Sequence, residues 1–228
     1  MEKRLIVFLA IVTLAIPTIC LATPPRPGPY ISGFLGATFP ASMDVTATQY
    51  DHGARTFNDR VEFDPNLNIG GSYGYDFGFV RIEGELAYKR GEISSINDQT
   101  SQVKYANVDG GVGVYSMMGN VFLDIRNPSP VTPYIGGGIG VATLYLDDTY
   151  GTNSSTGHRD LLYESDSNTV FAYQAGAGLE IALNNRLSLD LGYRYFGTAK
   201  TTFNKSSHIT TEMEFRSHNA SVGLRWKW

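Results

Sequence analysis

The sequence predicts an all-β fold, an eight-stranded antiparallel up-and-down barrel, on the basis of three observations. Apolar and polar side chains alternate with a period of two, and no long stretch shows the 3.6-residue period of an amphipathic helix. Long polar connections and short turns follow each other in strict alternation along the chain. All ten prolines lie outside the interiors of the predicted strands, where a proline would remove a ladder hydrogen bond.

Eight segments satisfy the alternation test. The second segment is the clearest, with Leu67, Ile69 and Tyr73 on one face and asparagine, glycine and serine on the other. The third sets apolar residues against Arg81 and Glu83, and the seventh alternates leucine and tyrosine with serine, aspartate and arginine. In chain order, the predicted strands cover residues 30–39, 66–77, 79–89, 107–125, 133–145, 168–183, 186–196 and 213–228.

The connections support an up-and-down order of these strands. Short turns are predicted at Gly78, at residues 126–132 and at Asn184–Asn185. Long polar loops follow the first, third, fifth and seventh strands, so that all of them lie at one end of the barrel. These loops cover residues 40–65, 90–106, 146–167 and 197–212.

The N-terminus has the composition of a secretory signal peptide. A basic start, Met1–Arg4, precedes the apolar stretch Leu5–Ile16 and a run of small residues that ends at Ala22. We therefore expect residues 1–22 to be removed and residues 23–228 to form the barrel. A lipoprotein modified at Cys20 is the weaker alternative, because Ile19 is bulky where that cleavage needs a small residue.

Composition excludes several classes of protein. The net charge of −4 argues against nucleic-acid binding, which normally requires a basic face. The single cysteine allows neither an intrachain disulfide nor a zinc site built from several cysteines. With 25 glycines and an aromatic share of 12%, the chain is unlike an ordinary helical domain.

Side-chain size indicates which face of the barrel points outward. The interior of an eight-stranded barrel is just wide enough for side chains to fill it. Glycine, serine and paired charges would fit there, whereas we expect the large aromatic residues not to fit. The apolar face therefore points outward to lipid, and the fold is a transmembrane β-barrel whose closure leaves no open edge in the hydrocarbon. A soluble lipocalin-like barrel with its apolar face inward is the alternative.

Aromatic residues on the outward face lie near the strand ends, as expected for rings at the two membrane–water interfaces. The ordinary strand preference of aromatic residues is the competing explanation. The predicted upper belt contains Tyr88, Tyr145, Phe171, Tyr173, Tyr193 and Tyr195, and the lower belt contains Phe77, Trp226 and Trp228.

Three segments carry a family resemblance: Arg81–Leu86, the glycine-rich Pro133–Gly140, and the last eight residues, Ser221–Trp228. With them, the chain resembles the eight-stranded outer-membrane barrels, which include the barrel of outer membrane protein A, outer membrane protein X, and the opacity and surface-antigen porin group. The last segment is the most specific. It matches that family's assembly signal, a polar residue followed by a glycine and by bulky residues up to a terminal aromatic, here Ser221, Gly223, Trp226 and Trp228.

The resemblance covers essentially the whole mature chain. It implies a bacterial outer-membrane protein with its long loops outside the cell and both termini in the periplasm. The implied partners are outer-membrane lipid and lipopolysaccharide, together with periplasmic chaperones and the barrel-assembly machinery. Unlike for outer membrane protein A, we expect no peptidoglycan-binding domain after the barrel, so tethering to the cell wall is not implied.

Charged residues of inward parity are nearly balanced between acids and bases. Because an unpaired charge in a confined space is costly, we expect ion pairs that involve Arg81 or Arg194. Such a network fixes packing and register, or alternatively gates small ions by exchange of partners. The predicted network contains Asp76, Arg81, Glu83, Glu85, Asp124, Glu180, Asp190, Arg194 and Arg225, with Lys89 and Lys227 also inward.

No segment predicts catalysis, a metal site or a cofactor. Gly70–Gly74 matches the G-x-S-x-G pattern of a nucleophile elbow, but Ser72 lies within a strand and no helix follows it. The four histidines are scattered without zinc spacing, and the acidic loop 146–167 lacks the spacing of an EF-hand. A lipid A-modifying barrel enzyme is an alternative, because Ser217–His218 faintly resembles a deacylase pair. Ser217 has inward parity, however, and His218 outward parity.

The sequence thus predicts a non-catalytic integral membrane barrel with a packed polar lumen and four long loops at one end. The loops are suited to adhesion, antigenicity or phage recognition, or equally to inert shielding, and their composition does not separate these roles. A narrow porin for ions or small solutes is the second hypothesis. A lumen filled with arginine and carboxylate side chains should conduct poorly.

Overall fold

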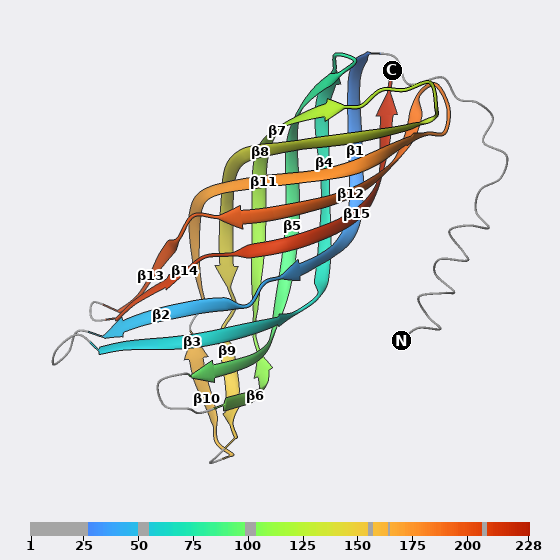
Figure 1. Ribbon diagram of the computed structural model, residues 1–228. Helices are drawn as coiled ribbons and strands as arrows, with labels where there is room; N and C mark the ends of the chain where they lie inside the picture. Colours follow the sequence, from blue (N-terminus) through green and yellow to red (C-terminus); the bar gives the residue numbers. More distant parts are fainter. Residues whose placement is uncertain (1–26, 50–54, 99–103, 155–156, 164, 207–208) are drawn as a thin grey trace, which may run out of the picture.

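Eight antiparallel strands form a closed barrel in the computed structural model of the protein (Figure 1). The structure describes residues 27–49, 55–98, 104–154, 157–163, 165–206 and 209–228. The predicted signal peptide, residues 1–22, lies outside these described residues. Within the described part of the chain, no helix is long and apolar enough to cross a bilayer.

Each barrel strand pairs with the next one along the ring, and β1 pairs with β15 to close it. The first and last strands are held together from Tyr30↔Lys227 to Pro40↔Ser217. The predicted up-and-down barrel is therefore confirmed. In ring order the strands are β1 (Gly28–Pro40), β4 (Asn66–Asp76), β5 (Val80–Asp98), β7 (Gly111–Asp124), β8 (Val131–Leu146), β11 (Asp166–Ala182), β12 (Leu187–Thr198) and β15 (Arg216–Lys227).

The four long connections contain further strands, which corrects the prediction of loops. Figure 1 shows them as hairpins that continue away from the end of the barrel opposite the C-terminus. Most of them are short and rich in polar residues, so the alternation that some of them show, such as Met43, Val45 and Ala47, does not distinguish them from loops in the sequence. They are β2 (Met43–Gln49), β3 (Arg55–Asp64), β6 (Lys104–Asp109), β9 (Thr149–Asn153), β10 (Arg159–Tyr163), β13 (Thr201–Ser206) and β14 (Ile209–Met213).

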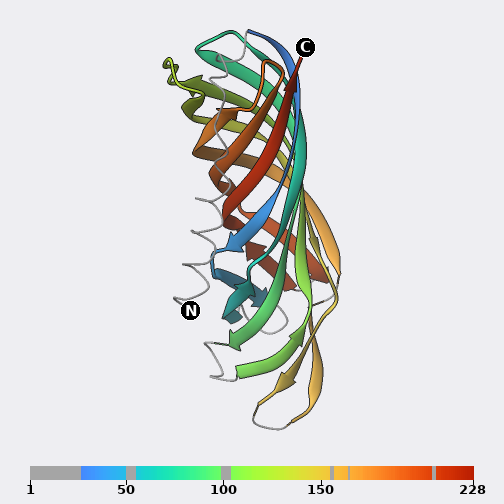
Figure 2. The same cartoon turned by 90° about the vertical axis from the view of Figure 1, so that its right-hand side faces the viewer.

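These hairpin strands continue the barrel wall. The outer half of β5 pairs with β3, β3 with β2, and β2 with β14, which in turn pairs with β13. On its other edge β5 pairs with β6, which pairs with β9 and through it reaches β10. Figure 2 shows this extension as a long tapering sheet on one end of the barrel. We call these seven strands with the outer half of β5 the hairpin extension.

Several predicted boundaries shift. The strand predicted at 79–89 continues to Asp98 because the hairpin extension provides it with partners. Residues 107–109 of the strand predicted at 107–125 belong to β6 instead of β7. Pro133, predicted as a first residue, is the third residue of β8, where its carbonyl accepts a hydrogen bond from the Ile125 amide at 2.8 Å. Gly78 forms the β4–β5 turn with φ +107°, a conformation that favours glycine.

The barrel has an apolar outer wall and an interior that buries charged side chains in one half and apolar side chains in the other, so the lumen is less uniformly polar than predicted. Tyr73 is 62% exposed and Trp226 is 46% exposed on the outer face, whereas Arg81 is completely buried inside. The soluble alternative would require the opposite arrangement. The interior itself has two layers, an ionic one at the end that carries the termini and an apolar one toward the hairpin extension.

Candidate functional site

The layer of the lumen nearest the termini is an ion network, and we call it the ionic layer. Arg225 donates to Glu180 and, at 2.8 Å, to Asp190. Arg81 on β5 pairs with Asp124 on β7 at 2.9 Å and lies 3.9 Å from Glu180. Six barrel strands are connected in this way by charges that are buried or, for Asp190 and Arg194, mostly buried. Its members are Asp76, Arg81, Glu83, Glu85, Asp124, Glu180, Asp190, Arg194, Arg225 and Lys227.

The mouth of the barrel near the termini is closed around Asp76. Its carboxylate accepts a hydrogen bond from Lys227 at 2.6 Å and two from one terminal nitrogen of Arg126 at 2.7 and 2.9 Å. The sequence pattern does not indicate Arg126, because this residue lies in the β7–β8 turn, where strand parity has no meaning. Arg126 therefore adds a cation to the network from outside the strands.

Toward the middle of the barrel, Arg194 on β12 forms an ion pair with Glu85 and lies 4.0 Å from Glu83. Glu83 also accepts hydrogen bonds from Tyr30 at 2.8 Å and Ser72 at 2.9 Å. Asn120 donates to both glutamates at 3.2 Å. Each buried carboxylate thus has neutral donors as well as a cation, which lowers the cost of its burial.

Aromatic rings also lie inside the barrel, which corrects the expectation that they would not fit. Tyr30 and Tyr134 are buried, and their hydroxyls donate to Glu83 and Asp190 at 2.8 Å. Each of four inward rings faces a glycine directly across the ladder, and a Cβ on that glycine would collide with the ring. These pairs are Tyr30↔Gly74, Phe34↔Gly70, Phe122↔Gly136 and Tyr134↔Gly178.

Arginine guanidinium groups stack on the same rings. The guanidinium carbon of Arg81 lies 4.6 Å from the centre of the Tyr134 ring, and that of Arg225 lies 4.9 Å from the centre of the Tyr30 ring. A ring of this kind fills space, accepts a cation on its face and donates from its hydroxyl. The rings therefore belong to the ionic layer, because they contact both its cations and its carboxylates.

Beyond the ionic layer, toward the hairpin extension, the lumen is filled by apolar side chains, and we call this part the apolar layer. Phe196 and Phe215 are both completely buried, and their ring centres lie 6.3 Å apart. Lys89 marks the boundary, with its ammonium 4.2 Å from the centre of the Phe196 ring. The layer consists of Ile93, Val112, Val114, Met118, Ala142, Leu144, Leu146, Ala172, Phe196 and Phe215.

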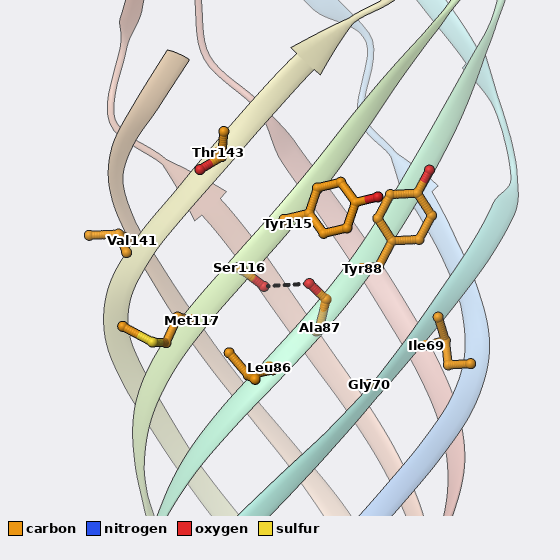
Figure 3. Close-up of a pocket in the computed structure, with 10 residues that line it drawn as sticks. All are labelled: Ile69, Gly70, Leu86, Ala87, Tyr88, Tyr115, Ser116, Met117, Val141 and Thr143. Atoms are coloured by element: carbon orange, nitrogen blue, oxygen red, sulfur yellow. Dashed lines mark hydrogen bonds between the residues drawn. The ribbon is translucent and has the colours of Figure 1, made fainter. Parts of the chain in front are cut away.

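All nine residues of the predicted aromatic belts are exposed or half-buried on the outer face. Tyr88 and Tyr145 both contact Tyr115, which the sequence analysis did not single out, with ring centres 4.6 and 5.5 Å away. Figure 3 shows Tyr88 and Tyr115 side by side above Leu86 and Met117, on the outer wall of β4, β5, β7 and β8. These side chains border a shallow apolar groove of 450 Å³.

A second aromatic group lies on the opposite wall. The Tyr193 hydroxyl and His218 Nδ1 are 2.6 Å apart, and the Tyr195 ring centre lies 5.3 Å from that of His218. Just above them Arg216 donates to Glu214 through two nitrogens, each at 2.8 Å. These hydrogen bonds hold the pKa of Glu214, in the connection between β14 and β15, below its ordinary value.

The residues of the predicted assembly signal lie on both faces of β15. Ser221 and Gly223 face inward, and Trp226 and Trp228 are 46% and 63% exposed on the outer face. A Cβ at Gly223 would lie 2.8 Å from the Gly33 carbonyl oxygen and 3.1 Å from Phe34 Cβ. This glycine therefore allows β1 to approach the last strand where the barrel closes.

The arrangement of the candidate nucleophiles does not support catalysis. Ser72 lies inside the barrel within the strand β4, where its hydroxyl donates to Glu83 at 2.9 Å and lies 2.7 Å from that of Ser32, instead of on an exposed strand-to-helix turn. Ser217 is completely buried, and His218 is exposed on the other face of the same strand, so the two cannot act as a pair. Among the described residues, no group of histidine and carboxylate side chains could hold a metal ion.

Comparison with known proteins gives a consistent result. A family model, the outer membrane protein beta-barrel domain, matches residues 6–227. The outer membrane protein PagN of Salmonella typhimurium is 26% identical over 205 residues, which is 82% of this chain and 81% of that protein. An opacity protein of Neisseria gonorrhoeae is 25% identical over 189 residues, covering 69% of this chain and 76% of that protein.

A solved structure shares the fold. The outer membrane protein OprG from Pseudomonas aeruginosa matches with a TM-score of 0.60 over 91% of this chain and 100% of that chain, at 14% sequence identity. At this identity the likeness concerns the fold alone.

Proposed function

Because the chain belongs to the family of outer membrane protein beta-barrel domains, we propose that it is a non-catalytic surface protein whose barrel anchors a rigid recognition element, the hairpin extension. The protein is an integral β-barrel of the bacterial outer membrane. In the proposed orientation the N- and C-terminal residues of the barrel domain lie on the periplasmic side, and the hairpin extension faces the surroundings of the cell.

The observation that carries this proposal is the continuity between the hairpin extension and the barrel wall. The strand β5 extends from Val80 to Asp98 and pairs with β4 and β7 in one half and with β3 and β6 in the other. Backbone hydrogen bonds therefore hold the extension to the membrane part without a hinge. A preorganised surface of this kind loses little conformational entropy when it binds a partner.

The filled lumen supports the same conclusion. The ionic layer and the apolar layer lie in series, and both consist of buried side chains. This packing does not favour the narrow porin, and the separation of Ser217 from His218 does not favour the lipid A-modifying enzyme. The hairpin extension is therefore the part of the molecule that a partner can reach, in agreement with an adhesion or surface-antigen role.

Removal of individual hairpins tests the proposal. Bacteria without adhesins of their own would express the full chain or variants in which a short turn replaces β2–β3 (residues 43–64) or β13–β14 (residues 201–213). We expect the full chain to increase attachment to host cells or matrix-coated surfaces and at least one hairpin removal to abolish that increase. Heat-modifiable migration on gels would show that each barrel still folds.

Equal attachment by the full chain, by both variants and by cells that lack the protein would contradict the adhesion role.

For the enzymatic alternative, purified protein would be incubated with lipopolysaccharide. The loss of an acyl chain, absent in His218→Ala, would contradict the non-catalytic assignment.

A further inference from the structure

The aromatic group on the outer wall of β11, β12 and β15 is a compact unit, which we call the Tyr–His cluster: Tyr173, Tyr193, Tyr195 and His218. Its members are neighbours across the ladder, because Tyr195 pairs with His218 and Tyr193 with Ala220. The ring centres of Tyr173 and Tyr195 lie 6.4 Å apart. Gly197 makes room for this packing, since a Cβ there would lie 2.6 Å from Tyr173 Cζ.

The cluster lies at the depth of the outer membrane–water interface in the proposed orientation. His218 and Trp226 are eight positions apart on β15. At roughly 3.4 Å per residue and a tilt of about 40°, this spacing corresponds to about 21 Å along the membrane normal. The apolar band of such barrels is about 25 Å tall. With Trp226 near the periplasmic interface, His218 is therefore near the opposite one.

Donors and positive charge remain available around the cluster. When the Tyr193 hydroxyl donates to His218 Nδ1, the imidazole proton is on Nε2, which has no partner among the described residues. Arg216 uses Nε and one terminal nitrogen to donate to Glu214. Its other terminal nitrogen has no hydrogen-bond partner among the residues that the structure describes. Lys200 is exposed nearby and acts electrostatically on Glu214. Among the side chains that the structure describes there, two cations thus face one carboxylate.

An apolar groove of 640 Å³ begins directly below the cluster on the same wall. Tyr193 belongs to both, so the polar cluster and the groove are continuous. Small residues from β11 and β15 form part of its lining, and branched residues from the neighbouring strands form its sides. The lining includes Leu35, Ala177, Leu191, Tyr193, Ala220 and Val222. Its volume lies within the range of about 300–1,000 Å³ that is typical of ligand sites.

We propose that this wall binds one molecule of lipopolysaccharide through its lipid A part. Arg216 and Lys200 contact a phosphate, the His218 Nε2 proton and the rings of Tyr173 and Tyr195 contact the glucosamine, and an acyl chain lies in the groove. A phosphorylated, acylated sugar matches this order of cation, aromatic ring and apolar groove along the membrane normal. The outer leaflet that surrounds an outer-membrane barrel contains lipopolysaccharide. For this reason we propose lipid A, and not a phospholipid, as the ligand.

The groove in Figure 3, on the opposite wall, provides a matched control. It also has tyrosines at its upper end, Tyr88 and Tyr115, and an arginine above them. That arginine, Arg90, lies 3.2 Å from Asp147 and 3.8 Å from Glu92, so two carboxylates face one cation. The excess negative charge disfavours a phosphate there. The two walls are therefore similar in shape and aromatic content but opposite in local charge.

Native mass spectrometry of the purified full chain in detergent would test the site. The probes are bis-phosphorylated hexa-acyl lipid A, the same lipid A without its phosphates, and phosphatidylglycerol. We expect one lipid A to remain bound, with affinity at least about tenfold lower for the dephosphorylated form and for phosphatidylglycerol, because charge-assisted hydrogen bonds are lost. Arg216→Ala/His218→Ala should lower lipid A affinity at least about tenfold, and Ala220→Trp, which fills the groove, should do the same. Arg90→Ala should bind as the unaltered protein does.

The results separate this site from general lipid association. Equal binding of phosphatidylglycerol and lipid A would overturn the proposal, and so would unchanged binding by Arg216→Ala/His218→Ala. A loss in Arg90→Ala of the same size would show that any surface arginine is sufficient, which also overturns it. Heat-modifiable migration of each variant excludes unfolding as the cause. The outcome does not depend on attachment to cells, so the adhesion proposal can fail or succeed separately.

Discussion

Three cations converge on one carboxylate inside the barrel. Arg225 donates to Glu180, and Lys227 and Arg81 lie 3.5 and 3.9 Å from it. Burial of a carboxylate away from water is costly in free energy. The three nearby cations offset this cost. The carboxylate also connects β11 to β5 and β15, so it determines how three strands are spaced around the lumen.

Replacement of this carboxylate by its neutral isostere, Glu180→Gln, should destabilise the barrel by about 3 kcal/mol. The substitution keeps the shape and leaves three buried cations with less compensation. Urea unfolding in lipid vesicles, followed by the gel mobility of the folded form, measures the loss. Glu214→Gln is the control, because that exposed pair with Arg216 should contribute less than about 1 kcal/mol. Equal effects of the two substitutions would contradict the role of burial.

The contact between Tyr134 and Gly178 makes a second prediction at this scale. A Cβ at position 178 would collide with the ring whose hydroxyl donates to Asp190. Gly178→Ala should therefore destabilise the barrel by about 1–3 kcal/mol, as overpacking does. Gly84→Ala is the matched control, since nothing lies within 4 Å of a Cβ there. In a Tyr134→Ala background the cost of Gly178→Ala should fall but not vanish, because the new Cβ would still lie 2.4 Å from the Leu191 carbonyl oxygen.

Glu214 provides a prediction about pH. The two hydrogen bonds from Arg216 favour the carboxylate, so the pKa of Glu214 in the folded state lies below its unfolded value of about 4.5. Its small stabilising contribution is present at neutral pH and is lost as the pH falls through the folded pKa. A carboxyl-carbon NMR titration should give a midpoint below 4.5, and Arg216→Ala should return it toward that value. An unchanged midpoint in Arg216→Ala would refute the assignment of cause.

At the scale of elements, the hairpins and the barrel strands depend on different interactions. Barrel strands each have an apolar outer face and a packed inner face, whereas the strands of the hairpin extension are joined to the barrel through backbone pairing with β5. The pairing of β12 with β15 continues up to Gly197↔Arg216 and does not require β13 or β14. The hairpin above this point should therefore be dispensable for the fold of the barrel.

Replacement of residues 201–213 by a short turn tests this independence. We expect the shortened chain to refold into vesicles with unchanged heat-modifiable migration. Its unfolding midpoint in urea should stay close to that of the full chain, because no barrel pair is lost. A control variant that loses the same total number of residues from β12 and β15 should not fold. A large drop in the midpoint of the hairpin variant would show that the extension stabilises the barrel.

The same division explains what the sequence could predict. Residues 66–77 alternate strongly because one face meets lipid and the other the lumen, and β4 ends within one residue of the prediction. The strand β2 also alternates, with Met43, Val45 and Ala47 on one face, but it is only seven residues long and lies in a polar stretch that resembles a loop. The inward position of Tyr30 was also missed. Its signal is a glycine, Gly74, directly across the ladder, and this pairing appears only once the register of two strands is known.

Arg126 illustrates a further limit. Its pairing with Asp76 connects a turn to a strand about fifty residues away in sequence, and no local period contains that information. The charges on strands behave differently, because inward parity alone assigns Arg81, Glu83 and Glu85 to the lumen. Which of these charges pair with one another depends on the stagger of the strands, which is a property of the closed barrel.

At the scale of the whole molecule, two layers of different chemistry close the lumen in series. The ionic layer spans the half near the termini, and the apolar layer, with Phe196 and Phe215, spans the half near the hairpin extension. A hydrated ion that passed the first would meet a region lined mainly by apolar side chains, where burial of a charge is very costly. Either layer alone is therefore a barrier to conduction.

Single-channel recording in planar bilayers tests this arrangement. The unaltered protein should give no conductance steps, and neither Phe196→Ala/Phe215→Ala nor Arg81→Ala/Arg194→Ala should conduct, because one barrier remains in each. The fourfold variant that combines them removes both barriers and should open a path, provided that heat-modifiable migration shows it folded. Steps from the unaltered protein would support the porin instead. Steps from only one of the two double variants would mean that a single layer forms the seal and that the other fills space, which the two-layer account does not allow.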